Sequence, residues 1–154
     1  LRGEPEDELR RRVQSFYEND VRHHYRDEAL TAVRTHRAKG EAVVLLTSAS
    51  IYVAEAVQAD LGLDDVLCNR FEVDPDGRFT GEPIEPICFG DGKRELAARW
   101  LEARGLTWAD AAFYTDSMAD LPVLEEVARP VVVSPDPRLH RRAKEAGWPV
   151  LEWS

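Results

Sequence analysis

The chain has 154 residues, of which 44% are hydrophobic and 32% charged, a balance typical of a globular domain rather than a disordered segment. Its formal net charge of −9 argues against a nucleic-acid partner, which would need a basic surface. No apolar run approaches the roughly 18 residues that span a bilayer, and the first residues are highly charged, so we expect a cytoplasmic protein that binds neither nucleic acid nor membrane.

Helical patterns come first along the chain. The spacing of Leu9, Val13 and Phe16 predicts a helix that reaches about residue 23. A second helix is predicted over 28–39, with Gly40 at its end. Beyond residue 41, strands and helices alternate, which favours a parallel sheet covered by helices on both faces. The predicted strands are 42–46, 66–73, 78–80, 111–114, 131–133 and 149–153, and the predicted helices are 51–61, 91–104, 121–127 and 138–146.

Polar side chains follow two of the buried strands. Thr47 and Ser48 come after the run AVVLL, and a second apolar run stops at Asp116, with Asp120 four residues later. In a parallel sheet both strand ends face the same edge, and ligands bind beyond it. A hydroxyl there can donate to a phosphate oxygen, and a carboxylate there can hold Mg²⁺, which prefers a few carboxylates, water and phosphate.

A lysine in the first turn of a predicted helix is the third signal. Lys93 lies in the sequence GDGK, and a cation at a helix N-terminus is unfavourable unless it meets an anion. Each of these residues also has a purely structural interpretation. Thr47 can precede an ordinary helix, Lys93 can be solvated, and Asp120 can be the N-cap of the next helix.

Several other motifs carry no chemistry. GDGK is not a phosphate-binding P-loop, because Arg94 follows the lysine in place of Ser or Thr. His23 and His24 lack the spacing to Cys68 and Cys88 that a zinc site requires. We expect the two cysteines to be reduced thiols, because two are too few for a disulfide framework.

The polar residues together resemble a known family. Thr47 after AVVLL, Lys93 in CFGDGK, and Asp116-Ser117-x-x-Asp120-Leu-Pro are similar to motifs two, three and four of the haloacid dehalogenase superfamily. The stretches TGEPIEPICFGDGK and PVVVSPDPRLHRRAKEAGW resemble its phosphoserine-phosphatase-like subclass IB. The resemblance implies an α/β fold, a three-layer Rossmann-like core with a parallel sheet. It makes residues 1–26 the end of a helical C1-type cap and residues 27–154 a core that lacks its first strand.

The resemblance also implies a mechanism and roles. A phosphatase of this family attacks phosphorus with an aspartate, and water then hydrolyses the aspartyl-phosphate. Thr47, with Ser48, would bind the phosphoryl oxygens, and Lys93 would neutralise their charge. Asp116 would ligate Mg²⁺, and Asp120 would ligate the metal or orient its waters. Positioning and charge neutralisation do most of the work in such chemistry.

The sequence departs from the family pattern in two places. Thr115 stands where the family has a glycine before its metal-binding aspartate, which should slightly crowd the loop. Motif one, Asp-x-Asp-Gly-Thr after an apolar strand, is missing. The sequence Asp74-Pro75-Asp76-Gly77 cannot replace it, because it follows motif two and holds a hairpin-turn pair. The nucleophile is therefore not among the residues that match the family.

The missing motif leads to an expectation about the whole protein. The family's motif-one strand lies between the strands that end at Thr47 and Asp116, and without it both would have unpaired edges. The chain also begins at Leu1 rather than Met. We therefore expect a C-terminal fragment, or an N-terminal segment that completes the sheet. Two alternatives remain: a catalytically inactive phosphate-binding or interaction module, and one domain of a fused enzyme.

The expected substrate is a small phosphorylated metabolite. The cap of this family selects the substrate, and only its end corresponds to residues of this chain. Arg22, Tyr25 and Arg26 lie near that end and are candidates for substrate contacts.

Overall fold

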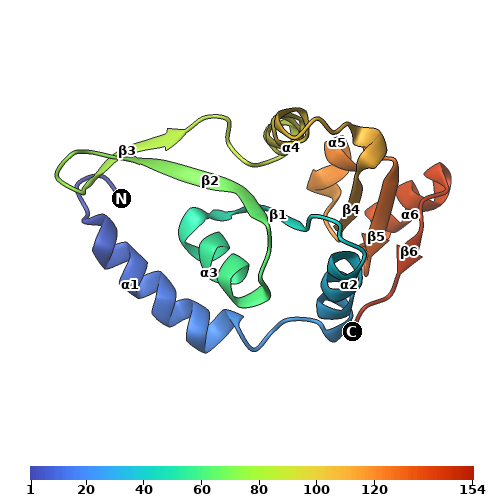
Figure 1. Cartoon of the computed structure of the whole chain (residues 1–154), viewed down its shortest axis with the longest axis horizontal. Coiled ribbons are helices and arrows are strands. Elements are labelled where there is room, and N and C mark those ends of the chain that lie inside the picture. Colours follow the sequence, from blue (N-terminus) through green and yellow to red (C-terminus); the bar gives the residue numbers. More distant parts are fainter. The chain divides into compact units, whose positions relative to one another are not determined.

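The computed structural model describes residues 1–154, which form two compact units, residues 1–88 and 89–154. Each unit combines a three-stranded sheet with helices (Figure 1). The predicted cap boundary at residue 26 falls inside the first unit and stays a prediction. None of the helices combines the length and the apolar character needed to cross a membrane.

The first unit begins with helices. Helix α1 spans Glu6–Phe16, and the acidic residues of its first turn suit the positive end of the helix dipole. The backbone continues as a five-residue π-helix, η1 (Tyr17–Val21), so the single helix predicted up to residue 23 is two segments. Helix α2 spans Asp27–Ala38, and α3 spans Ile51–Leu61 and ends at Gly62, which has a positive φ of 63°.

The sheet of the first unit contains one parallel and one antiparallel pair. Strand β1 (Val44–Ser50) pairs in parallel with β2 (Asp65–Val73), and β3 (Phe79–Ile84) returns antiparallel to β2. The predicted hairpin is confirmed. Its turn is built by Asp74, whose Oδ1 accepts the backbone N–H groups of residues 76 and 78, both at 2.9 Å. That carboxylate is part of the turn, which supports its rejection as a nucleophile.

The second unit is an all-parallel α/β arrangement. Its strands are β4 (Ala112–Thr115), β5 (Arg129–Val133) and β6 (Val150–Leu151), paired in that order. A core of four fully or nearly fully buried residues, Leu124, Val132, Leu139 and Ala143, joins this sheet to its helices. The helices are α4 (Asp91–Ala103), α5 (Leu121–Leu124) and α6 (Pro137–Ala146), with short 3₁₀ turns η2 (Trp108–Asp110) and η3 (Met118–Asp120).

Both sheets end in a parallel strand that has only one neighbour. In the first unit this strand is β1, which pairs with β2 alone, and in the second it is β4, which pairs with β5 alone. The strands that carry the predicted site residues are therefore edge strands. The predicted α/β class with parallel pairing is confirmed within each unit.

Candidate functional site

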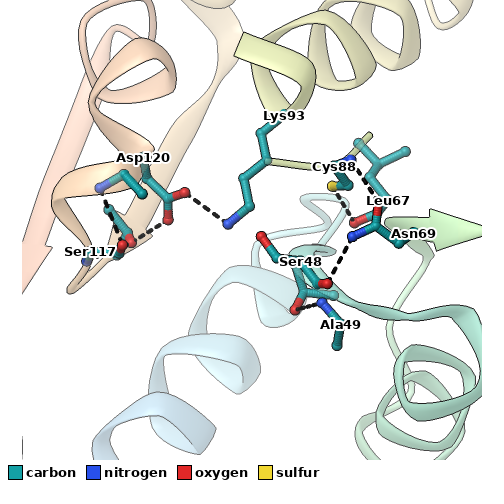
Figure 2. Close-up of polar contacts among 11 residues, drawn as sticks. Ser48, Ala49, Leu67, Asn69, Cys88, Lys93, Ser117 and Asp120 are labelled. Carbon is teal, nitrogen blue, oxygen red and sulfur yellow. Dashed lines mark hydrogen bonds and ion pairs between the residues drawn. The ribbon is translucent and has the colours of Figure 1, made fainter. Parts of the chain in front are cut away.

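Three buried polar side chains of the second unit meet at one point. Lys93 is 7% exposed, Thr115 8% and Asp120 4%. No other charged residue, serine or threonine of the chain is as buried. The Nζ of Lys93 donates to Oδ1 of Asp120 at 2.7 Å (Figure 2), and the hydroxyl of Thr115 donates to Oδ2 of Asp120 at 2.6 Å. Both oxygens of this carboxylate are thus bonded to protein donors.

Local backbone geometry places Lys93 at the start of α4. Gly90 precedes the helix with a positive φ of 53°, a conformation that glycine adopts without strain. The N–H of Lys93 then donates to the Gly90 carbonyl at 3.1 Å. A cation in this first turn is unfavourable, and the carboxylate of Asp120 offsets it. The sequence predicted that Lys93 would contact an anion, and in the structure that anion is the carboxylate of Asp120.

Asp120 lies at the N-cap position of α5, but its side chain makes no capping hydrogen bond. The structural alternative, in which this carboxylate serves only as a helix cap, therefore does not describe it. Its two oxygens bind the ammonium of Lys93 and the hydroxyl of Thr115 instead.

The loop that carries Asp116 is closely hydrogen-bonded. The hydroxyl of Thr115 accepts the N–H of Ser117 at 3.1 Å, and the hydroxyl of Ser117 accepts the N–H of Ala119 at 3.3 Å. Asp116 itself is exposed, at the carboxyl end of β4. A short ordered loop therefore presents this carboxylate at the strand end where the sequence predicted it.

The predicted phosphate-binding hydroxyls belong to the first unit. Thr47 and Ser48 lie within β1, which continues to Ser50 rather than ending at residue 46. The hydroxyl oxygen of Thr47 accepts the N–H of Ala49 at 3.1 Å, so its own hydrogen is available to donate. The structure thus groups the five predicted residues into two sets, Thr47 with Ser48 and Lys93 with Asp116 and Asp120.

Asn69 of β2 is a residue that sequence reasoning missed. Its Nδ2 donates to the carbonyl of Ser48, and its Oδ1 accepts the N–H of Cys88, both at 2.8 Å (Figure 2). One side chain therefore ties β1 at Ser48 to the end of the first unit at Cys88. The only signal in the sequence is an amide inside an otherwise apolar and charged strand pattern, VLCNRFEV.

The acidic side chains of the site differ in how they could serve a metal ion. No group of three or more His, Cys, Asp or Glu residues in the chain is arranged to hold one. Asp116 offers an exposed carboxylate at a strand end, which is the chemistry that Mg²⁺ uses when water and phosphate complete its shell. The donor chemistry therefore fits Mg²⁺ at Asp116, whereas the bonded oxygens of Asp120 suit an orienting role.

Tyr25 and Arg22, two of the residues predicted to contact the substrate, belong to a polar network of the first unit. The hydroxyl of Tyr17 lies 2.6 Å from that of Tyr25 and donates to Asp60 of α3 at 2.7 Å. Arg22 Nε lies 3.5 Å from the same carboxylate. Burial raises the pKa of both Tyr17 and Tyr25, and their hydroxyls stay protonated. This network joins the η1 segment to α3.

Comparison with known proteins gives a consistent assignment. The sequence profile of the family described as haloacid dehalogenase-like hydrolase matches residues 1–125. A histidinol-phosphatase of Neisseria meningitidis serogroup C (strain 8013) is 35% identical over 124 residues, 79% of this chain and 56% of that protein. The chain spans about half the length of the curated relatives it matches.

Solved structures share the fold. A protein of unknown function from Bordetella pertussis Tohama I has a TM-score of 0.88 at 30% identity, over 96% of this chain and 67% of that one. A probable phosphoserine phosphatase from Vibrio cholerae has a TM-score of 0.71 at 18% identity, over 92% of this chain and 42% of that one. The predicted Rossmann-like α/β core of the phosphoserine-phosphatase type is thereby confirmed. Because the family profile covers most of its length, the chain belongs to the haloacid dehalogenase-like hydrolase family.

Proposed function

We propose that the chain supplies the cationic and metal-binding part of a Mg²⁺-dependent phosphomonoester hydrolase that works through an aspartyl-phosphate. The buried pair of Lys93 and Asp120 carries this proposal. An ammonium has three N–H donors, and Asp120 engages one of those of Lys93. A buried cation in the first turn of a helix, with donors to spare, is suited to a further anion such as a phosphoryl group.

The proposed roles follow from these contacts. Lys93 donates to the phosphoryl oxygens and offsets their charge, while Asp120 holds its ammonium in place. Thr47 donates its hydroxyl hydrogen to a phosphoryl oxygen, and Ser48 lies beside it in β1. Asp116 ligates Mg²⁺, and Asp120 orients the water around it. The metal supplies charge neutralisation of the transferred phosphoryl group.

The attacking aspartate is proposed to come from a strand outside these 154 residues. Strands β1 and β4 each have an open edge, and such edges are normally paired or covered. The curated relatives are about twice as long as the matched region, which supports a contribution from further sequence. The proposed substrate is a small phosphorylated metabolite, in keeping with the histidinol-phosphatase relative.

The test uses the protein expressed from its complete gene. We expect hydrolysis of p-nitrophenyl phosphate to require Mg²⁺, to stop with EDTA, and to fall at least ~100-fold in Asp116→Asn, because a lost charge-stabilising contact costs about that factor. Asp91→Asn is the matched control. It removes a carboxylate with 82% side-chain exposure from the start of α4 and should leave activity unchanged.

Two results would change the proposal. Full activity in Asp116→Asn would remove this residue from the metal site. Absence of hydrolysis with Mg²⁺, together with retained binding of inorganic phosphate by calorimetry, would favour the alternative of an inactive phosphate-binding module.

A further inference from the structure

Thr115 is the residue that links the buried ion pair to the loop of Asp116. It is the last residue of β4, is 8% exposed, and occupies the position where the family resemblance leads one to expect glycine. Its hydroxyl has two partners. It donates to Oδ2 of Asp120 at 2.6 Å and accepts the backbone N–H of Ser117 at 3.1 Å. Rather than crowding the loop, this side chain is a bonded part of it.

The hydroxyl of Thr115 determines how the carboxylate of Asp120 is oriented. A hydroxyl-to-carboxylate bond of this length is charge-assisted and among the stronger hydrogen bonds in proteins. It holds Oδ2, so that Oδ1 is directed at Lys93 Nζ, 2.7 Å away. Without the hydroxyl, Oδ2 would be a buried charged acceptor with no donor, and rotation of the carboxylate would disturb its bond to Lys93.

We propose that Thr115 is a positioning residue that acts through Asp120 to fix the ammonium of Lys93 for phosphoryl binding. The inference rests on the proposed function for its effect on catalysis, and on the contacts alone for its effect on Lys93. It also gives the two acidic residues separate tasks. Asp120 is committed to Thr115 and Lys93, and Asp116 is the carboxylate that meets the metal.

The first measurement is steady-state hydrolysis of p-nitrophenyl phosphate by the protein from its complete gene. Thr115→Val keeps the shape of the side chain and removes the hydroxyl, so kcat should fall about tenfold to a hundredfold, the factor for a lost hydrogen bond to a buried charge. KM should rise by a smaller factor, because Thr115 acts on substrate binding only through Asp120 and Lys93. Thr115→Ser retains the hydroxyl and should restore most of kcat.

Thr107→Val is the matched control for stability. The hydroxyl of Thr107 accepts the N–H of Ala109, belongs to a capping box at η2 in the same unit, and makes no hydrogen bond to Lys93 or Asp120. Its loss should lower the free energy of unfolding by about 1 kcal/mol and leave the ion pair intact. If kcat also fell in Thr107→Val, the effect of Thr115 would be attributable to stability alone.

The second measurement follows Lys93 directly and needs no activity. In ¹⁵N-labelled protein, the buried ammonium should give a slowly exchanging ¹⁵N–¹H signal, assigned by its loss in Lys93→Met. We expect the signal to persist in Thr115→Ser and to broaden or vanish in Thr115→Val. An unchanged Lys93 signal and unchanged kcat in folded Thr115→Val would overturn the inference. A third outcome separates the two proposals. If the natural protein hydrolysed no phosphoester but the Lys93 signal were still lost in Thr115→Val, the positioning role of Thr115 would be upheld and the proposed function overturned.

Discussion

Removal of Lys93 from its buried pair should destabilise the protein strongly. The side chains of Lys93 and Asp120 are 9% and 6% exposed, so Lys93→Met leaves a carboxylate buried with the Thr115 hydroxyl as its only charge-stabilising partner. Breaking a buried ion pair at one partner costs about 3–5 kcal/mol. Since a typical domain is stable by roughly 5–15 kcal/mol, this is a large share of the total.

Adding Asp120→Asn to Lys93→Met tests whether the loss of stability comes from the unpaired buried carboxylate. In Lys93→Met with Asp120→Asn, no buried charge remains, and the amide oxygen of Asn can still accept from Thr115. The double variant should therefore recover about 2 kcal/mol relative to Lys93→Met alone, and the single variant Asp120→Asn completes the cycle that gives the coupling energy. Urea unfolding of the protein from its complete gene, followed by circular dichroism, measures all the free energies.

A surface pair on the same helix serves as the comparison. Arg99 and Glu95 are four residues apart on α4, with side chains 61% and 51% exposed. Arg99→Met should cost no more than about 0.5 kcal/mol, as exposed helix pairs do. The reasoning would be refuted if Lys93→Met cost as little as Arg99→Met, or if adding Asp120→Asn to it brought no recovery.

Two further predictions concern the first unit. Asn69→Ala removes hydrogen bonds to Ser48 and Cys88, so it should lower the free energy of unfolding by about 1–3 kcal/mol and weaken phosphate binding by calorimetry, whereas the exposed Asn19→Ala should change neither. Burial raises the pKa of the Cys68 thiol from 9.0 to about 11, so the folded state keeps a proton that the unfolded state loses. Stability is therefore fully present below pH 9 and should fall between pH 9 and 11, by up to ~3 kcal/mol. Urea unfolding across this range should show the loss in the natural protein and a smaller one in Cys68→Ala, and an equal slope in both would contradict the assignment.

The sequence predicted the elements of the fold well wherever a strong local signal marks them. The helix over 51–61 ends at Gly62 as expected, and the Asp76-Gly77 pair marks the β2–β3 turn. The π-helix at Tyr17–Val21 was not predicted, because the hydrogen bonds of Tyr17 to Tyr25 and Asp60 link residues of different segments. No helical periodicity contains that information.

The site was predictable in its residues but not in their partners. The misplaced cation at a helix start identified Lys93, and the strand-end rule identified Asp116. Neither rule says that the partner of Lys93 is Asp120, which lies 27 positions away. Thr115 was expected to crowd its loop, because a sequence pattern shows the volume of a side chain and not the two hydrogen bonds that its hydroxyl makes.

The open edges of β1 and β4 have a consequence for handling the polypeptide. Their sequences, VLLTSAS and AFYT, contain no lysine or proline, the residues that commonly keep exposed strands from recruiting one another. Expressed as these 154 residues alone, the chain would present two templates for β-augmentation between molecules. Short peptides that pair with these edges should therefore reduce its self-association.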